Sequence, residues 1–189
     1  MSDRTDARQM VGIFDHVNGL TIKDCSFIAK PNTYNDAIKF GNYGTKGVYG
    51  EVTIYGNYFE GFQQYLLWFG GYGVGTFNIE NNTFKNNGVT PGSHCAARFA
   101  AYVGPADGVS AINMIGNTID NSYMIIRIDA VSGRTATTQP VKVNNNKLLN
   151  CKADYYVKNS NAYNIDALNN TYDVTPTDSK FLNATWKSE

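Results

Sequence analysis

The 189-residue sequence lacks several features that would indicate a particular partner or environment. It has no excess of either charge, since sixteen basic residues balance sixteen acidic ones, and it contains no block of like charges. Bulk electrostatics therefore do not favour a nucleic acid or an anionic membrane as a partner. No run of about 18 apolar residues is present, so the sequence predicts no membrane-spanning segment.

The beginning, MSDRTDARQMVG, lacks the apolar stretch of a signal peptide. The three cysteines, Cys25, Cys95 and Cys151, form no CxxC motif and no Cys/His cluster, so we expect buried or half-buried thiols and no metal site. Charged residues make up only 17% of the chain, and Asn, Thr, Ser, Gly and Tyr must supply the polar surface. Such a composition is common in extracellular β-proteins. We expect an extracellular or cell- or virion-surface protein whose leader is absent here, with a cytoplasmic protein as the alternative.

What the chain has instead is a repeat. The segment FNIENNTF (77–84) has the pattern apolar, any, apolar, any, any, Asn, any, apolar. Copies begin at 24- to 35-residue intervals, and a period of this size indicates a solenoid or a propeller. The copies start at Val52, Phe77, Ile112, Val141 and Ile165, with asparagines Asn57, Asn82, Asn117, Asn146 and Asn170. An earlier copy from Leu20 has Cys25 in place of the asparagine.

The physical interpretation of one copy is a strand, a corner and a second strand. The spacing apolar-x-apolar predicts a short strand with one buried face. The intervening residue is polar in every copy, as a solvent face requires: Thr21, Thr53, Asn78, Asn113, Lys142 and Asp166. We expect the repeat asparagine to mark the bend, because Asn tolerates left-handed backbone well, and we expect stacked asparagines to hydrogen-bond to one another. The second strand should point one residue inward: Phe27, Phe59, Phe84, Ile119, Leu148 or Tyr172.

A third strand precedes each copy. The segments AIKFGNYG (37–44) and LLWFGGYG (66–73) are near copies, and the same place is taken by VGIFD (11–15), RFAAYVG (98–104), MIIRIDA (124–130), DYYVKNS (154–160) and FLNAT (181–185). Three strands per turn of about 29 residues predict an all-β, single-stranded right-handed parallel β-helix of about six coils and three parallel sheets, over one domain of residues 1–189. A propeller would need about 40 residues per blade.

This pattern resembles the right-handed parallel β-helix of the pectate-lyase-like superfamily, over nearly the whole chain from Val11 to Thr185. Neither end of the sequence predicts a cap for the stacked coils. We therefore expect the chain to be a piece of a longer coil or to self-associate through its exposed coil ends, because bare strand edges invite association.

In that superfamily the first strand of each coil, with its adjoining loops, forms the substrate groove. Strands about 4.8 Å apart would align five outward residues in a stripe about 19 Å long. They are Lys39, Trp68, Tyr102, Arg127 and Tyr156, and Asp129 follows Arg127 by two residues as a further member or as its ion-pair partner. Aromatic faces stack on sugar rings and basic groups pair with carboxylates or sulfates, so an acidic polysaccharide is the expected partner. A shift of one residue in the register of the strand expected at 98–104 would bury Tyr102 and expose Val103.

The sequence does not predict a defined catalytic centre. The outward positions lack the paired carboxylates of a glycoside hydrolase, and the superfamily's Asn-Thr-Asp, Asp-Asp, Gly-His-Gly and Arg-Ile-Lys motifs are absent. A lyase needs a base and a cation that neutralises the substrate carboxylate. The resemblance implies Lys or Arg as that base and Ca²⁺ held by Asp, but no Asp cluster marks such a site. The candidates for proton transfer are Lys39, His94, Arg98 and Arg127.

The sequence thus leads to two functional hypotheses from different classes. The first is a carbohydrate-contacting β-helix of a secreted or surface polysaccharide-active protein, with an acidic glycan along the first-strand sheet. The alternative is a non-catalytic structural or adhesin module, such as a phage tailspike shaft, and a polysaccharide lyase is the second alternative. We expect no cofactor, with Ca²⁺ only in the lyase case.

Overall fold

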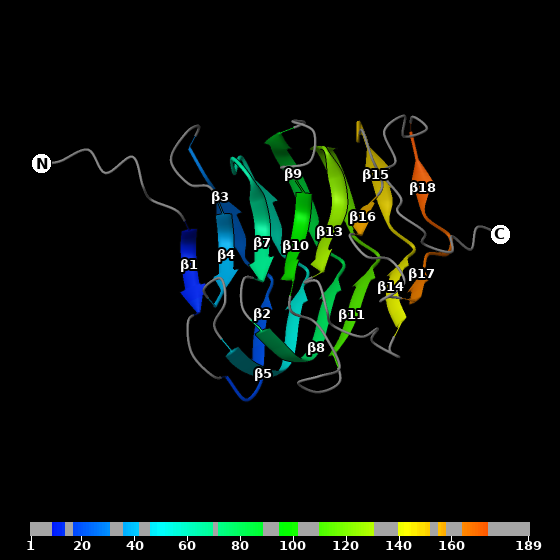
Figure 1. Cartoon of the computed structure of the whole chain (residues 1–189). Helices are drawn as coiled ribbons and strands as arrows, with labels where there is room; N and C mark the ends of the chain where they lie inside the picture. The colour runs from blue at the N-terminus through cyan, green and yellow to red at the C-terminus, as the bar shows by residue number, and fades with distance from the viewer. Residues whose placement is uncertain are drawn as a thin grey trace, which may run out of the picture.

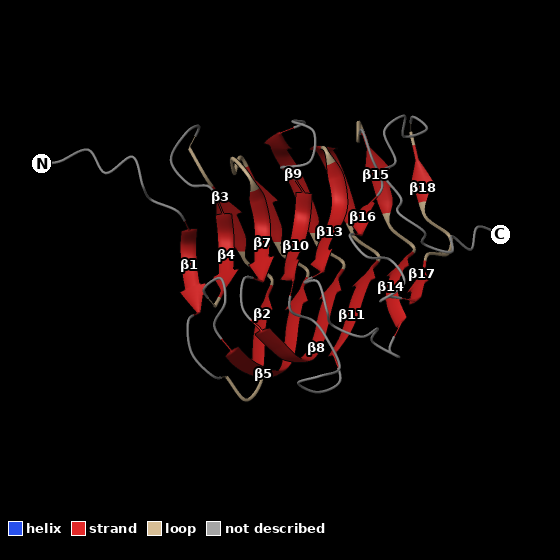
Figure 2. Cartoon of the chain, in the orientation of Figure 1, coloured by secondary structure: helices blue, strands red, loops and turns tan. Residues whose placement is uncertain are grey.

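The computed structural model of the chain describes residues 9–13, 17–30, 36–41, 46–69, 72–88, 95–101, 110–130, 140–151, 155–157 and 164–173. These residues form strands and short connections only, as Figure 2 shows. No apolar helix of membrane-spanning length occurs in this part of the chain.

The strands form three sheets of six parallel strands each (Figure 1). Sheet A contains β1 (Gln9–Ile13), β4 (Asp36–Phe40), β7 (Tyr65–Phe69), β10 (Cys95–Ala101), β13 (Met124–Ala130) and β16 (Tyr155–Val157). Sheet B contains β2 (Leu20–Lys23), β5 (Lys46–Tyr55), β8 (Tyr72–Glu80), β11 (Ser110–Ile115), β14 (Pro140–Asn144) and β17 (Asn164–Asp166). Sheet C contains β3 (Ser26–Ile28), β6 (Tyr58–Glu60), β9 (Thr83–Gly88), β12 (Thr118–Ser122), β15 (Lys147–Leu149) and β18 (Thr171–Tyr172).

The chain visits sheets A, B and C in turn, and each strand pairs with the strand three positions later. This is the topology of a parallel β-helix, and it confirms the predicted fold class. The register also confirms the repeat, because the first apolar residues of successive copies are paired across sheet B: Leu20, Val52, Phe77, Ile112, Val141 and Ile165. The first-strand segment expected at 181–185 lies outside the described residues.

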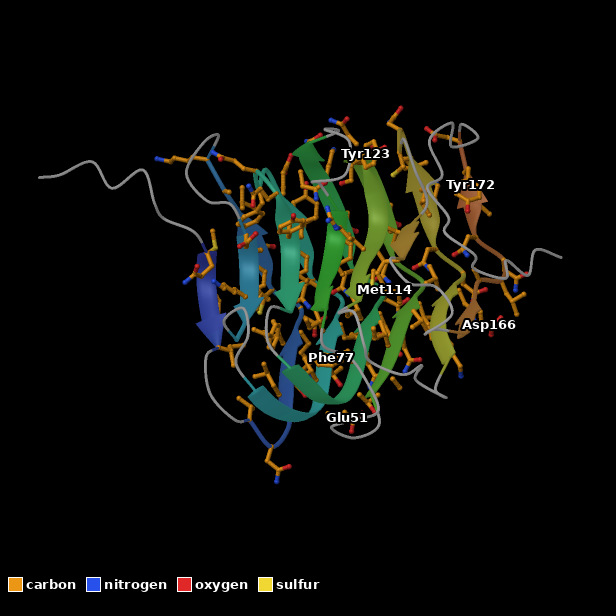
Figure 3. All side chains as sticks on the ribbon, viewed as in Figure 1. Glu51, Phe77, Met114, Tyr123, Asp166 and Tyr172 are labelled. Carbon is orange, nitrogen blue, oxygen red and sulfur yellow. The ribbon has the colours of Figure 1, made fainter. Side chains whose placement is uncertain are left out.

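The core runs along the axis between the three sheets. Phe77 and Met114, labelled in Figure 3, are 1% and 0% exposed and stand one coil apart on sheet B. On sheet C the rings of Phe27, Phe59 and Phe84 stack in parallel, with centroids 4.9 and 5.1 Å apart. Phe59 and Phe84 are fully buried, whereas Phe27, on the edge strand β3, is half-buried. The apolar rows therefore stack like on like, because each coil places the same repeat position above the previous one.

The corner between sheets B and C corrects one detail of the sequence interpretation. The left-handed residue is not the repeat asparagine but the residue before it, with φ between 55° and 67° in all six coils: Asp24, Gly56, Asn81, Gly116, Asn145 and Asn169. That residue turns the chain, so the following side chain enters the interior. The repeat asparagine is consequently a buried hydrogen-bonding residue, with Asn82 1% and Asn117 0% exposed.

The buried asparagines form a ladder, as expected from their stacking. In each step the backbone N–H and the Nδ2 of one asparagine both donate to the Oδ1 of the next, at 2.9 to 3.1 Å. The same Nδ2 also donates to a backbone carbonyl of the preceding coil, for example from Asn117 to Ile79 at 2.8 Å. At the first coil only the backbone N–H of Cys25 takes part, donating to Asn57 at 3.0 Å. Every amide in the middle of the ladder is thereby satisfied without water.

Candidate functional site

One row of register-paired residues crosses sheet A and contains most of the predicted site. The paired residues are Gly12, Lys39, Trp68, Arg98, Arg127 and Tyr156, one from each strand from β1 to β16. We refer to the five residues from Lys39 to Tyr156 as the sheet A row. Because paired residues occupy equivalent positions in a parallel sheet, the row brings three basic and two aromatic residues to the same register position on five neighbouring strands.

The register of β10 differs from the sequence interpretation. Arg98 pairs with both Trp68 and Arg127, so it occupies the place that was expected for Tyr102. Tyr102 itself lies outside the described residues. The strand begins earlier than expected because small buried residues start it, with Ala96 and Ala97 both 0% exposed.

A usable signal for this register was present in the sequence. Phe99 pairs with Phe69, and Phe69 pairs with Phe40, so a phenylalanine follows the row residue in three successive coils. Aligning on that phenylalanine, rather than on the glycine after it, places Arg98 in the row. The start of β10 was hard to recognise in the sequence because Ala96 and Ala97 contribute little to apolar periodicity.

Exposure varies along the row. Lys39 is only 7% exposed, and β4 is buried at all five of its positions. Lys39 and Arg127 both have interactions within the fold. Arg127 is half-buried, and the backbone alone is described for Trp68, Arg98 and Tyr156. The accessible cation among the described side chains of the row is therefore Arg127 rather than Lys39.

An apolar row lies beside the sheet A row, two residues earlier on each strand. Its members Ala37, Leu66, Ala96 and Ile125 are 0 to 1% exposed. Alternation puts this row on the same face as Lys39 and Arg127, while the intervening residues, including Ile38 and Ile126, are equally buried. Strands β4, β7, β10 and β13 are thus covered on both faces where they begin, as is usual for parallel sheets. The sheet A row lies two residues further along each strand than this apolar row.

The remaining candidate residues are placed less fully. Asp129 stands two residues after Arg127 on β13 and pairs in register with Ala100. His94 lies outside the described residues. Within the described ranges no group of three or more His, Cys, Asp or Glu side chains could hold a metal ion.

Two further polar rows on the outer faces were not anticipated. On sheet C the Tyr58 hydroxyl donates to Glu60 at 2.6 Å and Asn86 donates to the same carboxylate at 2.9 Å. The bond from Tyr58, followed by that from Asn86, lowers the pKa of Glu60, and the Glu60 carboxylate raises the pKa of Tyr58. On sheet B, Asn113 donates to Asn78 at 2.8 Å, and Asn78 donates to Glu51 at 3.0 Å. These groups bond to one another, so they stiffen the outer faces.

No protein-family model matches this chain, and no curated protein or solved structure is significantly similar to it. The functional argument therefore rests on the geometry of the sheet A row.

Proposed function

We propose that this chain is a carbohydrate-contacting parallel β-helix that binds an acidic polysaccharide along sheet A. We further propose that it shares its fold with the pectate-lyase-like superfamily and belongs to a secreted or surface polysaccharide-active protein. The observation that carries the proposal is the register of the sheet A row, in which Trp68, Arg98, Arg127 and Tyr156 follow one another on successive strands.

The row suits an extended anionic sugar chain for two physical reasons. Aromatic rings offer an apolar face to a sugar ring, and arginine pairs with an anionic substituent through a planar fork of donors. Parallel strands stand about 4.8 Å apart, so the four residues from Trp68 to Tyr156 extend over about 14 Å. The proposal assigns no catalytic step to this row.

The test is equilibrium binding of the chain to an array of acidic and neutral polysaccharides. Binding to acidic members should fall at least tenfold in Trp68→Ala and in Arg127→Ala. Lys142→Ala is the matched control, because Lys142 is an exposed cation on sheet B in register with Asp166. Unchanged binding in both row variants, or an equal loss in the control, would refute the proposed location. Appearance of unsaturated uronate products, followed by ultraviolet absorbance, would establish the lyase alternative.

A structural or adhesin module, such as a tailspike shaft, is the second candidate. It is favoured by the hydrogen-bonded rows along the axis, the buried ladder from Asn57 to Asn170 and the outer row from Glu51 to Asn113. Such rows stiffen a rod whether or not it binds a ligand. Sedimentation equilibrium separates the candidates, since a shaft of this kind associates side by side as a trimer, and exposed coil ends would give concentration-dependent stacking. A monomer that binds acidic glycans would exclude the shaft.

A further inference from the structure

We propose that Asn18 is a site of spontaneous modification, at which the backbone nitrogen of Gly19 attacks the side-chain amide and converts Asn18 into aspartate or isoaspartate. The inference does not depend on the proposed glycan binding. It starts from a dipeptide that occurs twice in the sequence, as Asn18–Gly19 and as Asn87–Gly88. Glycine after asparagine favours this reaction, because the missing Cβ leaves the nitrogen open and the backbone free to turn toward the amide.

The reaction requires no co-reactant except water. The nitrogen of Gly19 forms a bond to Cγ of Asn18, and the bond from Cγ to Nδ2 breaks, so that ammonia leaves with the proton of the backbone N–H. The resulting five-membered succinimide ring is then opened by water at either of its two carbonyls. One opening gives aspartate, and the other gives isoaspartate, in which the backbone runs through the former side chain. Either product replaces a neutral amide with a carboxylate.

The surroundings of Asn18 leave room for the reaction. Asn18 and Gly19 are both exposed, and they lie in the connection that precedes β2. Gly19 has φ of 103°, a conformation that residues with a side chain rarely adopt. The nitrogen of Gly19 and Oδ1 of Asn18 lie 3.0 and 3.3 Å from the position that a Cβ on Gly50 would take. The attacking atom and its target therefore adjoin the same glycine, which has no side chain to restrict them.

The second Asn-Gly dipeptide is held by the fold. Asn87 is 1% exposed and lies within β9, and its Oδ1 accepts a hydrogen bond from Oγ of Ser122. Gly88 pairs with Ser122 across sheet C. For Asn87 to react, its side chain would have to leave the interior and β9 would have to open, which occurs only in a small population of locally unfolded molecules.

The asparagine ladder protects exposed corner residues in a different way. Asn81 and Asn145 are exposed, and each precedes a ladder asparagine. The nitrogen that would attack Asn81 is the backbone N–H of Asn82, and the one that would attack Asn145 is that of Asn146. Both N–H groups donate to the next ladder residue at 2.9 Å. Exposure alone therefore does not select Asn18; the following glycine, which is not a member of the ladder, distinguishes it from these corners.

The experiment ages the native protein at pH 8 and 37 °C and follows each asparagine by peptide mapping with mass spectrometry. Modification at Asn18 should be about tenfold faster than at Asn87 or more, and Asn81 and Asn145 should stay unmodified over the same period. In urea, Asn18 and Asn87 should react at similar rates, because the same dipeptide is then free at both places. Chromatography of the Asn18 peptide should resolve isoaspartate as well as aspartate, since a succinimide opens both ways.

Asn18→Gln is the matched variant. Its longer side chain would have to close a six-membered ring, which forms far more slowly, and an exposed position should leave the melting temperature unchanged. Ion-exchange chromatography separates the acidic species that accumulate in the aged protein. The main acidic species of the parent protein should be absent from the aged variant.

Each contrary outcome overturns the inference. Equal rates at Asn18 and Asn87 in the native protein would show that the fold does not select between the two dipeptides. An Asn18 that reacts only after urea is added would show that the native connection prevents the attack. Aspartate without isoaspartate would indicate direct hydrolysis of the amide, and the same main acidic species in Asn18→Gln would place the reaction at another residue.

Discussion

The Oδ1 of Asn146 accepts two hydrogen bonds from Asn117. The backbone N–H of Asn117 donates at 2.9 Å and its Nδ2 donates at 3.1 Å. The pair shows how each coil is tied to the next through one side-chain oxygen. The same arrangement occurs one coil earlier, where the Oδ1 of Asn117 accepts from the backbone N–H and the Nδ2 of Asn82 at 2.9 and 3.1 Å. The ladder is therefore continuous through the core, and its members are mutually dependent.

The ladder predicts a large cost for removing one central amide. Asn117→Ala should lower the free energy of unfolding by about 3 to 5 kcal/mol, because several buried donors and acceptors lose their partner at once. Asn113→Ala is the matched control on the solvent face, where one bond to Asn78 is lost, and it should cost less than about 1 kcal/mol. Urea denaturation of both variants checks this, and equal losses would show that the ladder adds nothing beyond a surface hydrogen bond.

At the corner between sheets B and C, glycine and asparagine alternate in four successive coils, from Gly56 to Asn145. This alternation predicts that a larger residue at a glycine position would be destabilising. A Cβ on Gly116 would collide with Oδ1 of Asn81 in the preceding coil, and Gly116 has φ of 67°. Gly116→Ala should therefore destabilise the protein by about 1 to 3 kcal/mol from strain and contact together.

Two variants separate those causes. Adding Asn81→Ala to Gly116→Ala removes the collision but not the strained φ, so it should recover part of the loss. Asn145→Gly, at the same corner in the next coil, needs no new space and should change stability by less than about 1 kcal/mol. Thermal melting of the set tests the order, and a harmless Gly116→Ala would contradict it.

The stacked rings on sheet C predict that removing a ring costs more stability in the interior of the stack than at its edge. Phe59 lies between Phe27 and Phe84 and is 0% exposed. Phe59→Ala should cost about 3 to 5 kcal/mol through the cavity and the loss of both stacking contacts. Phe27→Ala, at the half-buried edge, should cost clearly less. Urea midpoints compare the two, and an equal cost would mean that the first coil is packed as tightly as the second.

The two described thiols should differ in reactivity. Cys25 is exposed, whereas Cys151 is 5% exposed. Burial raises the pKa of Cys151 from 9.0 to about 12. Iodoacetamide at pH 8 should modify Cys25 in the native protein and leave Cys151 unmodified until urea is added. Peptide mapping by mass spectrometry distinguishes the sites, and rapid native labelling of Cys151 would contradict its burial.

The raised pKa of Cys151 also has a consequence for alkaline stability. The folded protein disfavours the thiolate, so this contribution to stability is present below the unfolded pKa of 9.0 and is lost as pH rises toward about 12. Cys151→Ala should weaken the fall in unfolding free energy over that range. An unchanged pH dependence between the variant and the parent protein would refute the assignment to this thiol.

The corner shows what a single repeat could and could not reveal. The sequence indicated stacked asparagines, because Asn recurs at one position in five copies. It did not separate the turning residue from the buried one, since pairs such as Asn81–Asn82 and Asn145–Asn146 place two asparagines together. The residues of the first, second and fourth copies, Asp24, Gly56 and Gly116, were the available clue, because all tolerate left-handed backbone.

The candidate site was predictable only in part. Lys39, Trp68, Arg127 and Tyr156 fall in one row because the first strands of the coils, two of which are near copies in sequence, stack in register. The place of Arg98 and the burial of Lys39 were not foreseen. Strand alternation tells which residues share a face, but it does not tell what covers that face.

The sequence by itself determined the three strands per coil, the inward rows and the stacked asparagines, because alternation and turn preference act over a few residues. Only the tertiary structure decided that Arg98 stands against Arg127 and that Lys39 is 7% exposed. Register across a sheet is set by packing between residues about thirty positions apart, and small residues such as Ala96 and Ala97 leave little local trace of it.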